Sequence, residues 1–399
     1  MRMTDTTSDT RSSMAVFFSL GFRPFFLGAA LWALLVMALW LAQMFDVLTL
    51  PLRFDPVSWH AHAFLFGYLS AVIAGFLLTA VPNWTGRAAL SGLPLFLLVL
   101  LWVLGRLAVF TALWWPAALV ATLDLAFLTA MLFWLLREII AGKNWRNLIV
   151  VAMLLAFLGG NAVFHLEAAG GGYAAQGIGL RIGISAAVMM VAVIGGRIVP
   201  AFTRNWLVKQ GSDMLPAPVM AGFDKIALLV LLAAMVSWLA APQLVLSGGL
   251  LVVAGVLHLI RLGRWAGRHA MAEPLVAILH LGYAFVPFGA LAIGLGILGI
   301  GDGAAAQHLW MAGALGVMTL AVMTRASLGH SGRALISDPV TVLIYAAIVM
   351  SVLLRWVAGN WPEQQGLLHG ISGGAWIIAF GGFALSYGAM MIRPRADQA

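Results

Sequence analysis

The sequence of 399 residues contains no cysteine. Without a thiolate, disulfides, thiolate-ligated haem, cysteine-ligated iron–sulfur clusters and blue-copper sites are all excluded. Any metal that this chain binds must therefore use histidine, methionine, carboxylate or backbone ligands.

Charged residues are also scarce. They make up 9% of the chain, against 63% hydrophobic residues, and the mean hydropathy is +1.01. A soluble domain carries more charge on its surface. Apolar runs of about 20 residues recur, which is the length of a helix that crosses a bilayer, whereas the short alternating segments of an outer-membrane barrel are absent. The sequence therefore predicts an all-α polytopic membrane protein embedded in a lipid bilayer.

The apolar runs predict twelve transmembrane helices. The first run follows about 20 polar residues and lacks a small-residue cleavage site after it, so we interpret it as a retained helix and not as a signal peptide. The expected spans are residues 25–45, 57–81, 90–112, 114–136, 146–168, 178–201, 222–240, 243–262, 274–299, 306–327, 339–358 and 366–391.

Lysine and arginine are divided unequally between the two sides of these spans. With the N-terminus in the cytoplasm, 18 of the 22 basic residues lie on the cytoplasmic side, and only Arg53, Arg106, Arg181 and Arg355 do not. The positive-inside rule then places both termini in the cytoplasm. We expect a cytoplasmic N-terminal segment at 1–24, a transmembrane domain at 25–391 and a cytoplasmic tail at 392–399. The same bias explains the net charge of +8 without a nucleic-acid partner.

This topology sorts the nine histidines into two layers. A histidine at a helix end commonly bonds to a neighbour or to headgroup water, but ionisable residues within spans usually mark a site or a pathway. Neutral imidazole is also the commonest metal ligand and suits haem iron and copper. The outer layer contains His60, His62, His165, His308 and His369, and the inner layer contains His258, His269, His280 and His330.

His60 and His62 stand two residues apart in the segment WHAHAFLFGY. Because each residue advances an α-helix by about 100°, their side chains point about 200° apart and cannot both bind one metal from a regular helix. We expect them to serve two centres on opposite sides of the helix, or one to be a ligand and the other to support it.

An internal repeat relates the second and tenth spans. Residues 62–87 align with 308–333 without a gap at an offset of 246, so that His62 corresponds to His308. The sixth span ends in the related segment GRIVPAFTRNW. Since these spans are four apart, we predict three four-helix units around a pseudo-threefold axis, with sites at their interfaces. The alignment makes His62 and His308 the expected partners at one centre, with His60 facing another.

Six segments resemble the NnrS family: GFRPFFLGAALWALL, WHAHAFLFGYLSAVIAGFLLTAVPNWTGR, GNAVFHL, GRIVPAFTRNW, PLVAILHLGY and GVMTLAVMTRASLGHSGR. The resemblance implies a twelve-helix bacterial inner-membrane protein that carries haem b and copper and acts in nitric oxide metabolism or resistance. Family members usually have an acidic residue after the second motif histidine, where this chain has Ala63, so a proton-handling role for that acid is not expected here. The metal ligands implied by motif are His60, His62, His165, His280, His308 and His330.

The family likeness is accompanied by a looser likeness of fold to the haem–copper oxidase core and to nitric oxide reductases. It favours a redox protein that reduces nitric oxide at a histidine-ligated metal near the periplasmic side, with quinol as the candidate electron donor. Arg53, Arg181 and Arg355 are candidates to pair with haem propionates, or are interfacial residues that snorkel. Two further hypotheses are a proton-coupled secondary transporter and a membrane protein that binds haem or metal without turnover.

Two acidic residues are candidates for catalysis. Glu167 lies two residues after His165 and is a candidate proton donor or support for that histidine. Asp124 lies in the middle of the fourth span, where it is either protonated, paired with a residue such as Arg106, or part of a proton pathway.

Overall fold

A computed structural model describes residues 13–396, and this part of the chain is helical and contains no strand. Twelve helical segments in it are long and apolar enough to cross a membrane, which confirms the predicted number. The spans are α2 (Phe22–Met44); α3 (Pro56–His62) with η1 (Ala63–Tyr68) and α4 (Leu69–Thr85); α5 (Leu93–Phe110); α6 (Ala117–Ala141); α7 (Leu148–Ala169); α8 (Ile178–Met190) with η5 (Val191–Gly195) and α9 (Gly196–Lys209); α10 (Gly222–Ala240); α11 (Val245–Gly263); α12 (Pro274–Ile297); α13 (Gly303–His308) with η7 (Leu309–Val317) and α14 (Met318–His330); α15 (Pro339–Asn360); and α16 (Gln365–Ile392).

Short segments complete the helical inventory of this part of the chain. The helix α1 (Ser13–Phe17) precedes the first span, and single 3₁₀ turns lie at Ala112–Trp114, Trp145–Asn147, Ala174–Gln176, Gly267–His269 and Pro362–Gln364. The expected segments 1–24 and 392–399 fall partly outside the described residues, because residues 1–12 and 397–399 are not described.

Acidic caps fix the starts of several spans. Asp55 accepts a hydrogen bond from the backbone N–H of Ser58 at 2.9 Å and so begins α3. Asp302 and Asp338 cap α13 and α15 in the same way. A carboxylate here satisfies one of the free N–H groups of the first turn and interacts favourably with the positive end of the helix dipole. The helices α3 and α13, which carry His60, His62 and His308, therefore start at defined residues.

The second, sixth and tenth spans form the centre of the molecule. In the most apolar part of these spans 78%, 67% and 72% of residues are buried, compared with 33–44% in every other described span except the ninth, at 72%. Each of the three also contains a π-helical segment, namely η1, η5 and η7. Such segments widen one turn of a helix and are frequent at functional sites. The segments η1 and η7 begin at Ala63 and Leu309, which correspond in the predicted repeat of the second and tenth spans, while the threefold relation itself stays a prediction.

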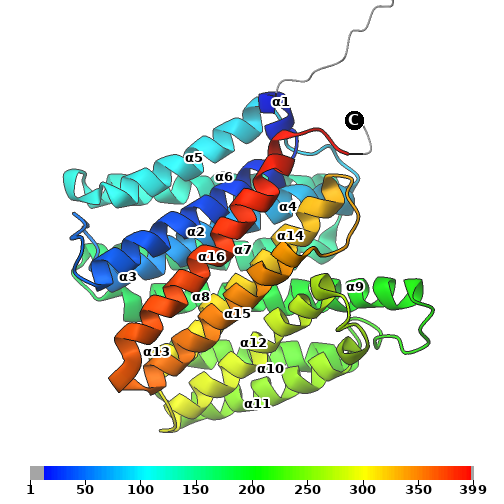
Figure 1. The fold of residues 1–399 in the computed structure, drawn as a ribbon. Helices are drawn as coiled ribbons and strands as arrows, with labels where there is room; N and C mark the ends of the chain where they lie inside the picture. Colours follow the sequence, from blue (N-terminus) through cyan, green and yellow to red (C-terminus); the bar gives the residue numbers. More distant parts are fainter. Residues whose placement is uncertain (1–12, 397–399) are drawn as a thin grey trace, which may run out of the picture.

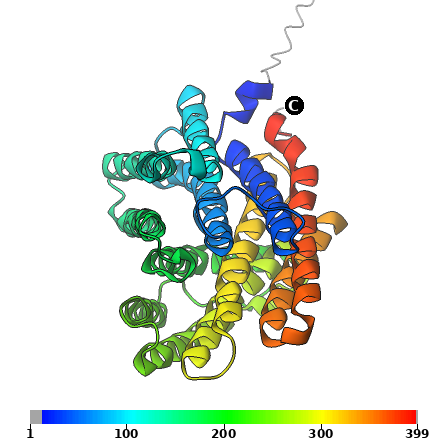
Figure 2. The same cartoon turned by 90° about the vertical axis from the view of Figure 1, so that its left-hand side faces the viewer.

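The remaining spans surround these central helices. Consecutive helices pack together as antiparallel neighbours, with α5 beside α6, α7 beside α8 and α10 beside α11. The last span, α16, crosses the front of Figure 1 between α2 and α15 and packs against both, so that the first and last spans are adjacent. Figure 2 looks from the end at which α3 begins and shows the green helices nearly end-on, while the blue, yellow and red helices run obliquely.

Candidate metal centres

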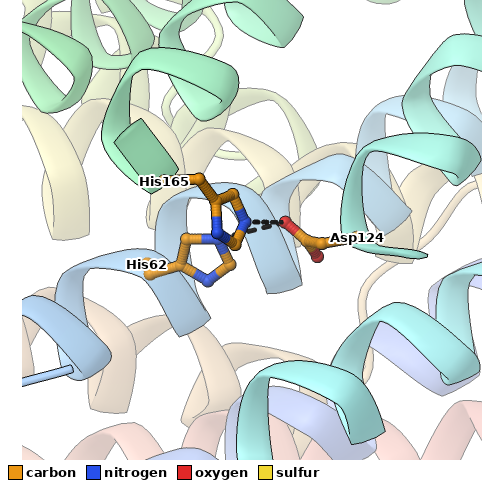
Figure 3. Close-up of side chains that lie close together, drawn as sticks. All are labelled: His62, Asp124 and His165. Atoms are coloured by element: carbon orange, nitrogen blue, oxygen red, sulfur yellow. Dashed lines mark hydrogen bonds and ion pairs between the residues drawn. The ribbon is translucent and has the colours of Figure 1, made fainter. Parts of the chain in front are cut away.

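A buried carboxylate gathers two histidines and an amide between α3, α6 and α7. The Nε2 atoms of His62 and His165 lie 3.1 and 3.0 Å from Oδ2 of Asp124, and the Asn161 amide donates to the same oxygen at 2.8 Å. Figure 3 shows both rings pointing at the carboxylate from their separate helices. All four side chains are buried. We call these four residues the carboxylate cluster.

Arg106 on α5 provides the positive charge that this carboxylate needs. Its guanidinium donates to the other carboxylate oxygen, Oδ1 of Asp124, and is itself 4% exposed. An isolated charge in this position would be very costly, but a paired and hydrogen-bonded one is tolerated. Of the three states considered for Asp124, the structure shows the ion pair with Arg106.

The carboxylate cluster has the donor set of a metal site. One ligand atom from each of His62, Asp124 and His165 lies within 4.8 Å of the others. Two imidazoles and one carboxylate are a recurrent set for iron or zinc, and imidazole is also a suitable ligand for copper. Arg106 binds only Oδ1 in this cluster, so Oδ2 faces both histidines. The cluster can therefore either hold a cation or persist as a closed hydrogen-bonded unit.

A second group of histidines lines a cavity on the opposite side of α3. His60, His308 and His369 surround it together with Arg355, and the cavity has a volume of about 220 Å³. Its other walls are largely apolar and aromatic, and Trp40 stacks on His60 with ring centroids 4.3 Å apart. We call this space the histidine cavity.

His60 and His308 face each other in the histidine cavity. Their rings are nearly parallel, at 20°, with centroids 6.5 Å apart. This separation is too long for ring-to-ring contact and leaves room for one metal ion between them, since metal–nitrogen bonds are about 2 Å long. Nδ1 of His308 hydrogen-bonds to the carbonyl of Ala304 at 2.8 Å, which leaves Nε2 as the free nitrogen. Such a bond fixes the tautomer of a metal-binding histidine.

Polar atoms in this cavity have no partner within the protein. Nδ1 of His60, Nε2 of His369 and a terminal nitrogen of Arg355 are buried without a hydrogen bond to any described residue. Buried polar atoms are nearly always satisfied, so these three point to a ligand, an ion or water in the cavity.

The structure corrects the predicted pairing of His62 with His308 and agrees with the predicted opposite directions of His60 and His62. His62 does not face His308: it belongs to the carboxylate cluster, and the partner of His308 is His60. The prediction that His60 and His62 project to opposite sides of their helix agrees with these contacts, because the carboxylate cluster is formed with α6 and α7 and the histidine cavity with α2, α13 and α16.

A family comparison agrees with the segments noted in the sequence. The family model described as NnrS protein matches residues 16–395, nearly the whole chain. The chain belongs to the NnrS family. A search of curated proteins found no match.

The arginines expected to serve an NnrS haem are placed very differently. Arg355 lines the histidine cavity. Arg181 is half-buried and donates to the carbonyl of Gln176 at 2.7 Å, and Arg53 is exposed. Within the described chain, only Arg355 of the three lies at the cavity.

Glu167 has a structural contact instead of a histidine partner. Its carboxylate accepts hydrogen bonds from the backbone N–H groups of Ile178 at 2.7 Å and Gly179 at 3.2 Å. It therefore caps the first turn of α8, and His165 instead turns toward Asp124.

The other two candidate ligands of the NnrS resemblance lie apart from both centres. His280 on α12 hydrogen-bonds to the hydroxyl of Thr203 at 2.8 Å. His330 ends α14 and packs against the ring of Phe22. The structure brings neither of them to a second histidine among the residues described.

Two contributors to these NnrS centres were missed by the sequence interpretation. Asn161 lies one helical turn before His165, in the motif GNAVFHL, and this spacing puts both on one face of α7. A buried amide in an apolar span was the available signal. His369 was assigned to the outer layer but not to a ligand set, because a lone histidine at a helix start gives no partner.

Proposed function

We propose that this NnrS protein is a haem- and copper-binding redox protein of the bacterial inner membrane that acts in nitric oxide metabolism or resistance. The observation that carries the proposal is the pair His60 and His308, which face each other at 6.5 Å across an apolar, aromatic cavity. His60 and His308 come from two different helices, and imidazole is a ligand that suits haem iron.

The residues of the histidine cavity fit a haem in character. His60 and His308 would be the iron ligands, and Arg355 with its unpartnered nitrogen would receive a propionate. When bound, the haem would supply one-electron chemistry at a potential set by its axial ligands and by burial. Through Ala304 the protein fixes the tautomer of His308, and it surrounds the site with largely apolar and aromatic walls.

The carboxylate cluster fits copper by its ligand types. His62, His165 and Asp124 would hold the ion, and imidazole is a common copper ligand. Asn161 and Arg106 keep the carboxylate oriented, and Arg106 balances its charge. The charges of Arg106 and Asp124 cancel. The ligands left for a cation are the imidazoles of His62 and His165 and the carboxylate oxygen Oδ2, which the guanidinium does not contact.

The proposed reaction is the reduction of two nitric oxide molecules by two electrons and two protons to nitrous oxide and water. We place both centres toward the periplasmic side, with both termini in the cytoplasm, because this orientation leaves only four basic residues outside. Quinol is the proposed electron donor, since the whole helical core lies within reach of the bilayer.

Metal analysis of the purified protein in detergent tests the proposal. We expect a Soret band, a pyridine haemochrome of haem b and bound copper, together with nitric oxide consumption in reduced membranes. His60→Ala should lose haem and retain copper, and His62→Ala should do the reverse. His269→Ala, a loop variant outside both centres, is the matched control.

The alternatives give different results in the same experiment. A folded protein without haem or copper would overturn the redox proposal and favour a transporter. Bound metals without nitric oxide consumption under any reductant would favour a binding protein without turnover.

A further inference from the structure

A second, almost wholly apolar pocket lies between the three central helices. It is lined by α4, by α8 with η5 and α9, and by η7 with α14, and its volume is about 80 Å³. Apart from Thr319, every lining side chain is apolar or is glycine. We call this space the apolar pocket. A space of this size and character stays dry and accommodates only a small apolar molecule.

The apolar pocket and the histidine cavity share a wall. Leu69 and Leu315 line both spaces. Tyr68 lines the histidine cavity and Thr319 the apolar pocket, and their hydroxyl groups are joined by a hydrogen bond of 2.7 Å. The partition between the two spaces thus consists of two leucine side chains and one hydrogen bond.

Leu69 and Leu315 are both 4% exposed, and each of them adjoins both spaces. Thr319 also donates to the carbonyl of Leu315 at 2.6 Å, so its hydroxyl is already satisfied within its own helix. The pocket therefore offers no free polar group that would retain water or a charged ligand.

The pocket is also open at its rim. Ile73, Ile194 and Val322 line it and are half-buried, and they belong to the three central spans at some distance from the span ends. An apolar molecule that enters at these side chains meets only apolar groups and the satisfied hydroxyl of Thr319 on its way to Leu69 and Leu315. An ion or a polar solute would pay a large desolvation cost on the same path.

We infer that the apolar pocket is a holding site for a small apolar gas molecule, of the size of a diatomic, which passes from it into the histidine cavity between Leu69 and Leu315. The inference rests on the proposed function in one respect, since nitric oxide is a small apolar diatomic. The route supplies the reactant from the lipid phase, where such gases are concentrated, and keeps it separate from water.

Xenon tests the pocket without any cofactor or activity. Crystals or detergent samples under xenon pressure should show one bound atom in the apolar pocket, seen by anomalous scattering or by a saturable NMR shift. Val322→Trp, which fills the rim, should abolish this binding. Val349→Trp, also half-buried but on α15 and lining neither space, should retain it.

The passage to the histidine cavity is tested by opening the wall. Leu315→Ala should add a xenon position in the histidine cavity and should accelerate carbon monoxide association with the reduced haem, whereas Val322→Trp should slow it. Leu320→Ala, a buried change on the same helix that lines neither space, should leave both readouts as in the wild type.

The outcomes separate this inference from the proposed function. No xenon in the wild-type pocket, or binding that Val322→Trp leaves intact, would overturn the holding site. Equal association rates in the wild type, Leu315→Ala and Val322→Trp would overturn the route. Protein without haem would overturn the proposed function alone, and xenon positions in Leu315→Ala would then decide whether the two spaces communicate.

Discussion

Removing Arg106 should destabilise the protein strongly, and removing the charge of Asp124 as well should restore much of the loss. The two side chains are 4% and 0% exposed and bonded to each other. Arg106→Met leaves the buried carboxyl group of Asp124 without its counter-charge. Breaking a buried ion pair by deleting one partner costs about 3–5 kcal/mol.

The double variant Arg106→Met/Asp124→Asn removes both charges together. Exchange of a whole buried pair for neutral residues is often close to neutral in free energy. The amide oxygen of the new asparagine still accepts from one or two of the three remaining donors, His62, His165 and Asn161. We therefore expect the double variant to lose about 1–3 kcal/mol, the cost of one buried group left unsatisfied.

The measurement is the fraction of monodisperse protein after heating in detergent, supported by unfolding in increasing dodecyl sulfate. Arg53→Met is the matched control, because Arg53 is exposed and its loss should change the free energy of unfolding by less than about 0.5 kcal/mol. A double variant no more stable than Arg106→Met would refute the reasoning, since the carboxylate charge would then not be the cause of the loss.

Three further predictions concern residues outside the two centres. Glu167→Gln should lower the free energy of unfolding by about 0.5–1 kcal/mol, because it weakens the cap of α8, and should leave the metal content unchanged. A fall in nitric oxide consumption without any loss of thermal stability would instead support the proton-donor hypothesis for Glu167. Gly196→Ala should lower thermal stability by about 1–3 kcal/mol, because its Cβ would overlap a terminal nitrogen of the buried Arg261. A stability equal to that of the wild type would contradict this packing. Hydrogen bonds from the side chain and the backbone N–H of Thr341 lower the pKa of Asp338, so the ionised carboxylate stabilises the protein above about pH 4 and this stabilisation is lost as the pH falls through the folded-state pKa. Asp338→Asn should remove this part of the acid dependence of unfolding. An acid-unfolding profile of the variant equal to that of the wild type would contradict the prediction.

The fold was largely predictable because the bilayer imposes a simple rule. A span must be long and apolar, and each of the twelve expected spans corresponds to an observed helical segment. The boundaries differ where apolar character does not mark the helix end. The sixth span continues to Lys209, beyond the expected 201, because the amphipathic segment that follows remains helical without being apolar enough to be recognised as part of the span.

The candidate site was predictable only in part. The spacing of His60 and His62 gave their opposite directions, because this depends on one helix alone. Their partners depend on how different helices meet. The internal alignment makes His62 and His308 equivalent residues of two repeat units. Equivalent residues occupy similar surroundings in their own units, and they contact each other only if they lie on the rotation axis that relates the units. Under the predicted threefold relation, His62 and His308 should therefore face different interfaces, as they do.

A π segment directly follows the two histidines on the helix that contributes to both centres. The π segment η1 follows His62 directly, and its widened turn leaves backbone carbonyls for outside donors. The indole N–H of Trp32 donates to the carbonyl of Ala63 at 2.9 Å, and that of Trp102 donates to Gly67 at 3.0 Å. Unsatisfied backbone groups are very costly inside a membrane, so these two tryptophans stabilise the widened turn. Side chains from α2 and α5 therefore support the π segment that directly follows the two histidines.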